Sequence, residues 1–479
     1  MIWNHEIETC EQLFYEVEDA IEIDLSKFNT SKITSMNNMF YNCKQLQNIN
    51  FGNIDTSSVR DMQFMFCNCF SLRALDLSNF NTSQVIYMDF MFENCLSLSF
   101  LNLSNFDTSN VISMYCMFNQ CKSLKSLDLT KFNTSIVISM SSIFSGCSSL
   151  KSLNLSNFNT SLTVTMDKMF NYCSSLISLD LSNFNTSNVY TMDYVFSDCH
   201  SLVYVNLSSF RNTNLYYMKS WFSNCYSLTS IDISNFYIDG LDMQYFFSKC
   251  ISLKKIIFPK VFNPSNAISM FSGCSSLLSI DLSNYKFDKC LDMKNFFTGC
   301  SSLTSIKFGK INSSLLTNTE SMFSGCVSLI SLDLSSMYTP SITNINQMFF
   351  DCNSLIYLNI DNFDTSLITE MKNIFYNCLK LTSLNLGNFN TSIVTDMQSM
   401  FYGCDSLISL NLSSFNTSLV NNMNSMFYNC NNLVSLNLSN FKINKYSKMD
   451  LMFAGCSSLK VIDLSNYNDN NGYSINGIF

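Results

Sequence analysis

One phrase of 26 residues recurs along almost the whole chain. The stretch CLSLSFLNLSNFDTSNVISMYCMFNQ, residues 95–120, returns in recognisable form at Cys121, Cys147 and Cys173 and onward to Cys456. A period of this length is typical of a repeat solenoid, in which each repeat buries its apolar side only by stacking on its neighbours. The 479 residues therefore need no single large core, because a solenoid grows by adding coils.

Each repeat predicts a short strand followed by a helix. Leu98, Leu101 and Leu103 alternate with positions 100 and 102, which predicts a strand with its leucines inward. Residues 107–109 predict an Asx-type turn that caps a helix. The apolar residues that follow are spaced as on one face of a helix of about ten residues; they are Val111, Met114, Met117, Phe118 and Cys121.

The L-x-x-L-x-L pattern predicts an α/β leucine-rich repeat solenoid of about 18 coils. Strands stack at ~4.8 Å whereas helices need ~10 Å, so we expect a curved solenoid with parallel strands on the concave face and short helices on the convex face. The domain prediction is one solenoid over 1–479. Residues 1–16 form a partial repeat with a cap helix, 17–464 the repeats, and 465–479 a C-terminal partial repeat.

Regularity breaks at 237–273, where two successive repeat cysteines follow at 25 and 24 residues instead of 26. This stretch holds two of the three prolines and a local basic cluster of Lys254, Lys255 and Lys260. One interpretation is a tolerated deletion with altered helix geometry. The other is a hinge or docking point, because basic charge stands out in an acidic chain.

Cysteine usage indicates a buried thiol ladder. Of the 21 cysteines, 17 occupy the same repeat position, and stacked coils hold equivalent side chains parallel rather than converging as a disulfide needs. No row of histidines accompanies the thiols, and the C-x2-C spacing of structural zinc sites is absent. We expect small core residues with weak S–H donors.

The eighth residue of each repeat should face outward from the strand, and in 16 of 18 repeats it is Asp or Asn. The first nine alternate strictly between the two, and Asp128, Asp180 and Asp232 are among them. Alternation separates carboxylates that would repel on adjacent strands, which is a structural interpretation. The competing interpretation is a stripe that binds cations or polycations, although calcium prefers six to eight surrounding oxygens and a flat ladder supplies few.

The sixth position is mostly Ser, with Phe100, Tyr204 and Tyr357 as outward-facing exceptions. Exposed aromatic side chains are common anchors of protein interfaces. These three residues, the basic cluster and the three aspartates are therefore the candidate interface residues. The monotony of the other repeats favours an extended surface over one sculpted pocket.

The residues argue against an enzyme. His5 and His200 are the only histidines, and neither belongs to a nucleophile, metal or phosphate-loop motif. Identical groups are spread along a line, whereas catalysis needs different groups converging on one spot. We expect no cofactor. A net charge of −9 also disfavours nucleic acid as a partner.

The repeat M-F-x-x-C-x-S-L-x-x-L-[DN]-L-S-x-F-[DN]-T-S-x-V-x-x-M resembles that of BspA-like leucine-rich repeat surface proteins over residues 7–479. This resemblance implies a right-handed solenoid, a protein partner, and adhesion at the cell surface. The N-terminus has no signal-peptide pattern and no apolar run is long enough to span a bilayer, which predicts a cytoplasmic protein instead. An intracellular scaffold is the alternative function. A third is a rod that associates end to end through the last coil, which ends at Ile478 and Phe479.

Overall fold

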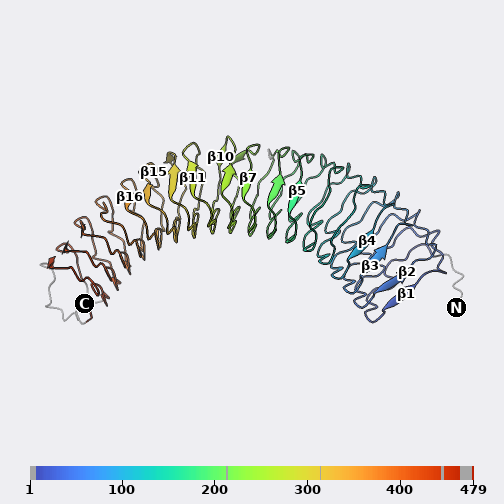
Figure 1. Ribbon diagram of the computed structural model, residues 1–479, viewed down its shortest axis with the longest axis horizontal. Coiled ribbons are helices and arrows are strands. Elements are labelled where there is room, and N and C mark those ends of the chain that lie inside the picture. The colour runs from blue at the N-terminus through green and yellow to red at the C-terminus, as the bar shows by residue number, and fades with distance from the viewer. Residues whose placement is uncertain (1–6, 212–213, 313, 444–446, 464–476, 479) are drawn as a thin grey trace. The chain divides into compact units, whose positions relative to one another are not determined.

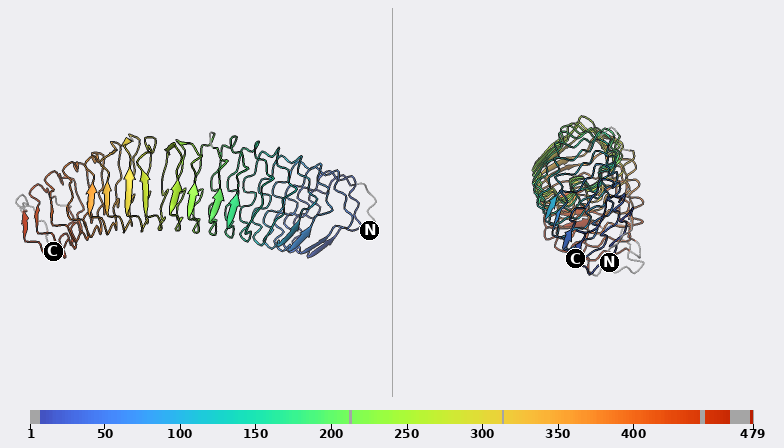
Figure 2. Two further views of the ribbon diagram at one scale, coloured as in Figure 1. Left: turned by 45° about the horizontal axis from the view of Figure 1, so that its top comes forward. Right: turned by 90° about the vertical axis from the view of Figure 1, so that its right-hand side faces the viewer.

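The computed structural model of the chain describes residues 7–211, 214–312, 314–443, 447–463, 477 and 478. They form two compact units, one of residues 1–237 and 255–260 and the other of residues 238–254 and 261–479. Within each unit, each repeat is one coil, and successive coils stack with their strands parallel (Figure 1). Two further views show the strands of each unit following one side of the stacked coils (Figure 2).

Short strands occur in both units, and all but the two-residue strands β8, β10, β13 and β15 lie in the segment with the inward apolar pattern. The first unit contains β1 (Glu22–Asp24), β2 (Asn48–Asn50), β3 (Ala74–Asp76), β4 (Phe100–Asn102), β5 (Ser178–Asp180), β6 (Tyr204–Asn206), β7 (Ser230–Asp232) and β9 (Lys255–Ile257). The second contains β8 (Ile238–Asp239), β10 (Phe262–Asn263), β11 (Ser279–Leu282), β12 (Ser305–Phe308), β13 (Ile311–Asn312), β14 (Ser331–Asp333), β15 (Met337–Tyr338), β16 (Tyr357–Asn359), β17 (Ser409–Leu410), β18 (Ser435–Asn437) and β19 (Val461–Asp463).

The predicted strands are confirmed in 15 of the 18 repeats. Paired strands run parallel, and in most pairs the register is offset by one 26-residue repeat, as between Leu75 and Leu101. Leu101 is 8% exposed and Phe100 is 55% exposed, so the inward and outward positions are those that the alternation predicts. Adjacent coils therefore align equivalent side chains into rows.

The predicted helices are wrong, because the described residues contain none. The segment from the first Met of a coil to its Cys, such as Met36–Cys43, is a series of tight turns, here called the turn arc. Met39 N donates to Met36 O (3.2 Å), a contact over three residues rather than the four of an α-helix. Asn38 N donates to Gln63 O of the next coil (2.9 Å). The backbone of the arc thus bonds between coils, as a strand does.

Left-handed backbone at two positions excludes a helix from each arc. Asn38 has φ 55° and Asn42 has φ 59°, values that suit the third residue of a type II turn and break a right-handed helix. The residue before the repeat cysteine is Gly, Asn or Asp in 14 of 17 repeats, and these residues adopt that conformation at low cost. Two four-residue turns reproduce the apolar spacing of a helix. A curved solenoid was expected because helices are wider than strands, and without helices that reason is absent.

The two predicted ends of the solenoid fare differently. Residues 7–16 form turns instead of the expected cap helix, and Gln12 has left-handed backbone (φ 56°). Most of the C-terminal partial repeat predicted at 465–479 lies outside the described residues. Of that stretch, Gly477 and Ile478 are described, and their carbonyls accept hydrogen bonds from the turn arc of the preceding coil.

The core is a stack of aromatic rings beside the predicted row of thiols. Phe40, Phe66 and Phe92 stack face to face at centroid distances of 5.4 and 5.6 Å. Cys69 is fully buried, and its Sγ donates to Phe40 O (3.2 Å). All 21 cysteines are free thiols, and burial raises the pKa of Cys147 to about 12.

The polar turn after each strand is confirmed as an Asx turn, although no helix follows it. Ser109 N donates to Asp107 Oδ1 (2.9 Å). Thr108 is fully buried, and its hydroxyl both donates to Asn133 O and accepts from Asn133 N at 2.8 Å each. The Thr108 hydroxyl therefore joins its coil to the next by two hydrogen bonds.

The irregular stretch predicted at 237–273 contains the boundaries between the two units. The chain enters the second unit at residue 238, returns to the first over 255–260, and re-enters the second at 261. Strands β8 and β10 pair within the second unit in this stretch. The hinge interpretation stays a prediction.

Candidate interaction site on the strand face

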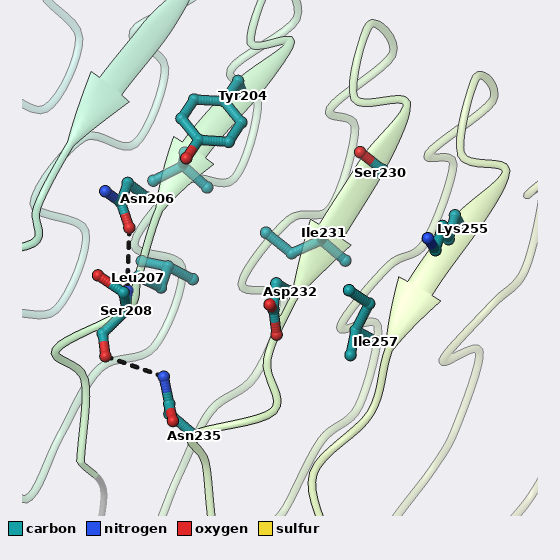
Figure 3. Close-up of a pocket in the computed structure, with 11 residues that line it drawn as sticks. Tyr204, Asn206, Leu207, Ser208, Ser230, Ile231, Asp232, Asn235, Lys255 and Ile257 are labelled. Atoms are coloured by element: carbon teal, nitrogen blue, oxygen red, sulfur yellow. Dashed lines mark hydrogen bonds between the residues drawn. The ribbon is translucent and has the colours of Figure 1, made fainter.

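A shallow hollow interrupts the strand face of the first unit. It spans β6, β7 and β9 and has a volume of about 210 Å³ (Figure 3). Side chains of Tyr204, Asp232, Lys255 and Ile257 line it, with Ser230 between them. These residues occupy the sixth and eighth positions of three repeats.

The hollow forms where the strand ladder is broken. β5 pairs with β6, and β7 pairs with β9, but these pairs belong to separate two-stranded sheets. Asn235 Nδ2 donates to Ser208 O (2.9 Å) across this break, at the turns that follow β6 and β7. The small Ser230 leaves space beside Tyr204, so the step in side-chain size deepens the gap.

The lining combines an aromatic ring, an aliphatic side chain and two opposite charges. Tyr204 is 55% exposed and Ile257 is 42% exposed. Figure 3 places the Ile257 side chain beside Asp232 on the neighbouring strand, with Lys255 at the start of β9. Asp232 is held in place because its Oδ1 accepts from Ser234 N (2.9 Å). The site therefore offers apolar contact with polar groups on both strands.

The structure brings together some of the predicted interface residues and separates others. Tyr204, Asp232 and Lys255 share the hollow. Phe100, Asp128, Asp180 and Lys260 lie elsewhere in the first unit, and Lys254 and Tyr357 belong to the second. Sequence reasoning missed Ile257 and Asn235 as lining residues. Ile257 carried a usable signal, because it departs from the Asp/Asn rule of the eighth position.

The Asp/Asn ladder has a structural task in each coil. Asp128 Oδ1 accepts from Thr130 N (3.0 Å), and Asn154 Oδ1 accepts from Ser156 N (3.1 Å) in the next coil. The Thr130 N–H holds the pKa of the Asp128 carboxyl below its ordinary value. Either residue type closes the turn after the strand, because both supply the acceptor oxygen.

No three His, Cys, Asp or Glu side chains in the described part of the chain are grouped so as to hold a metal ion. The cation-binding interpretation of the ladder stays a prediction. Among the residues described, no helix has the length and apolar character that crossing a membrane requires.

The comparison with protein families decides the relationship. The model described as "Mycoplasma protein of unknown function, DUF285" matches in seven overlapping segments, which are residues 8–127, 64–177, 112–236, 151–258, 241–356, 265–381 and 343–467. The chain belongs to the DUF285 family. That family's description gives no function, and none of the curated proteins compared with this DUF285 chain matches it.

Solved structures similar to this DUF285 protein include bacterial repeat proteins. A leucine-rich repeat protein from Bacteroides ovatus is 20% identical, with 95% of this chain and 91% of that chain covered and a TM-score of 0.40. A leucine-rich cell surface protein from Faecalibacterium prausnitzii is 14% identical, with 93% and 87% covered and a TM-score of 0.26. A leucine-rich repeat protein from Leptospira interrogans is 13% identical, with 93% and 96% covered and a TM-score of 0.27. All three likenesses are distant.

Proposed function

We propose that this DUF285 protein is a non-enzymatic binding protein that holds a protein partner on the strand face of its first unit. The observation that carries the proposal is the hollow at β6, β7 and β9. Exposed Tyr204 stands there beside an aliphatic and two charged side chains, on a face where half of the coils carry Ser at the sixth position and Asp or Asn at the eighth. Aromatic anchors in such settings dominate protein–protein binding energies.

The size of the hollow favours a protein over a small molecule. Pockets for drug-sized ligands have volumes of ~300–1,000 Å³, and this one has about 210 Å³. That is room for one side chain of a partner. An apolar or aromatic side chain fits between Tyr204 and Ile257. Charged groups beside it would meet Lys255 or Asp232.

Adhesion at a cell surface is the finer form of this proposal, and its support is the resemblance of the repeat to BspA-like surface proteins. The alternative, an intracellular scaffold, has support of its own. All 21 cysteines are free thiols, as is usual for proteins of a reducing compartment. Protease treatment of intact cells separates the two: loss of the chain places it on the surface, and protection retires the adhesin.

The binding proposal is tested by cross-linking and then by affinity. A photo-reactive amino acid replaces Tyr204 in the full chain, and the same residue at Ser126, the equivalent position two coils before β5, is the control. The proposal expects one protein partner cross-linked from position 204 and not from position 126. Equal labelling from both positions would contradict it.

Affinity for that partner then tests the hollow itself. Tyr204→Ser installs the residue that most coils carry, and Tyr357→Ser makes the same change at an equally exposed tyrosine of the second unit. An anchor of ~2 kcal/mol corresponds to about a 30-fold loss of affinity for Tyr204→Ser. No loss for Tyr204→Ser would refute the site. A loss for Tyr357→Ser as well would mean that the interface extends along both units.

A further inference from the structure

A second hollow, of about 420 Å³, lies in the turn arcs of three successive coils of the first unit. Its walls are Tyr172, Tyr194 and Lys168, all exposed side chains. Its floor consists of small or buried polar residues, among them Asn171 and Ser197. This hollow shares no residue with the one at β6, β7 and β9.

The hollow exists because large and small side chains have exchanged places relative to the coils around Tyr376 and Tyr402 in the second unit. The residue after the core Phe of each coil is Asn171, Ser197 and then Ser223 here. In the second unit, Tyr376 and Tyr402 occupy that row and stack at 4.3 Å, which fills it. At the wall positions the sizes are reversed, because the large side chains Tyr172 and Tyr194 stand here and small ones stand in the coils of Tyr376 and Tyr402. Thus the same backbone builds a ridge in one unit and a hollow in the other.

The wall rings offer flat faces to a ligand. Tyr172 is 52% exposed, and no ring of the described residues stacks on it. Tyr194 is 38% exposed, and Lys168 Nζ lies 5.8 Å from its ring centroid. This contact holds the Lys168 ammonium at the edge of the hollow.

The far end of the hollow carries a carboxylate in a fixed orientation. Asp198 Oδ2 accepts from Ser197 Oγ (2.7 Å), and its Oδ1 accepts from Asn224 Nδ2 (2.8 Å). Its side chain is 16% exposed, so its position is set by these bonds rather than by solvent. An ionised carboxylate has about four acceptor positions. His200 Nε2 also lies 3.8 Å from Oδ1, so Oδ2 is the oxygen that keeps a position for a ligand's hydroxyl group.

We propose that this hollow binds a neutral saccharide, with a sugar ring against Tyr172 and its hydroxyl groups bonded to Asp198, Asn224 and Lys168. A pyranose ring presents an apolar C–H face and a hydroxyl edge, which matches an aromatic wall beside fixed polar groups. The volume lies within the range of small-ligand sites, ~300–1,000 Å³. The inference stands apart from the protein-binding proposal.

Other ligand classes fit the lining less well. A lipid or other apolar ligand needs aliphatic walls, and this hollow is lined by Tyr, Asn, Ser, Lys and Asp. An anion that pairs with Lys168 would be repelled by Asp198, and a cation that pairs with Asp198 would be repelled by Lys168. The single positive and single negative charge in the lining therefore select a neutral molecule that makes many hydrogen bonds.

The test is a printed array of neutral and acidic oligosaccharides probed with the full-length protein, followed by titration calorimetry on the best neutral binder. We expect Tyr172→Ala to weaken binding at least tenfold. Ser223→Tyr is expected to abolish it, because it rebuilds the ridge found at Tyr402. Tyr216→Ala removes a 70% exposed tyrosine outside the hollow and is the matched control, expected to bind as the unmodified chain does.

Three results would overturn the inference: no neutral oligosaccharide binds at millimolar concentration, only acidic ones bind, or binding survives both Tyr172→Ala and Ser223→Tyr. Thermal unfolding of each variant checks that loss of binding is not loss of the fold. Other coils carry tyrosine at the position equivalent to 223, so Ser223→Tyr is the variant of the two that is expected to preserve the fold. Tyr204→Ser should leave saccharide binding unchanged, since it lies in the other hollow.

Discussion

The buried threonine of each coil gives the sharpest test of how the coils are held together. Thr365 is 1% exposed, and its hydroxyl donates to Asn390 O (3.0 Å) and accepts from Asn390 N (2.8 Å). Thr339 occupies the same position one coil earlier and is fully buried. Its Oγ1 has no hydrogen-bond partner among the described residues. One unit thus holds both a satisfied and an unsatisfied copy of the same side chain.

Replacing either threonine by valine keeps the shape and removes the hydroxyl. For Thr365→Val, two hydrogen bonds are lost at a net ~1 kcal/mol each, so the expected cost is about 2 kcal/mol, and more if water cannot reach the freed backbone groups. For Thr339→Val, no bond is lost and an unpaired buried oxygen is removed. That substitution should be neutral or stabilising by up to ~1 kcal/mol.

The assay is thermal unfolding of the full chain followed by far-UV circular dichroism. A loss of about 2 kcal/mol in a unit of this size lowers the midpoint by roughly 4–8 °C for Thr365→Val. The midpoint of Thr339→Val should not fall. Equal shifts for both variants would refute the reasoning, because they would show that the hydrogen bonds of Thr365, which Thr339 lacks, do not contribute to stability.

Three further expectations follow from the same structure. The far-UV spectrum should lack the double minimum of an α-helix, and a strongly helical spectrum would restore the helices that the turn arcs exclude. Ellman's reagent should react slowly with the folded protein, because burial raises the pKa of thiols such as Cys404 to about 12. The exception is Cys456, which is only half-buried and whose pKa is lowered by a hydrogen bond from Cys430, so Cys456→Ser should remove the fastest phase. The pKa values of Asp128 and Asp180 lie below the ordinary 3.8 in the folded protein, so both carboxylates stabilise the fold above that pH, and this contribution is lost as the pH falls below it. Replacing both by Asn should therefore reduce the acid sensitivity of the unfolding midpoint. The turn contacts should be retained at pH 7.

The strand half of each coil was predictable because one physical rule determines it. A period of two places Leu101 inward and Phe100 outward, and the 26-residue repeat sets the register of neighbouring strands. The turn half was not predictable from apolar spacing. Consecutive four-residue turns and a helix both bring apolar residues to one side at intervals of three and four. The signal that distinguishes these turns from a helix is the residue before the repeat cysteine. In most coils it is Asn, Gly or Asp, as at Asn42 and Gly146.

The candidate site was predicted in part for a related reason. Tyr204 and Lys255 depart from the repeat at a position known to face outward, so sequence alone marks them. That the ladder breaks between β6 and β7 depends on backbone pairing and has no sequence signature that we recognise. The second hollow was out of reach as well, because a predicted helix would have arranged Tyr172 and Tyr194 differently.

Function in such a chain is therefore to be sought where side chains leave the hydrogen-bonded and stacked rows. The repeated Thr, Cys, Phe and Asx side chains hold the coils together, because their hydrogen bonds and ring contacts are made within the fold. Both hollows lie instead where these rows change: the first where the strand ladder breaks between β6 and β7 beside the small Ser230, and the second where side-chain size changes over three successive coils. Each can then be altered without disturbing the other, because Ser223→Tyr fills the second hollow whereas Tyr204→Ser removes the anchor of the first. If closing one hollow impaired ligand binding at the other, the two would be coupled through the stacked core, and the view of coils as independent carriers of separate sites would have to be given up.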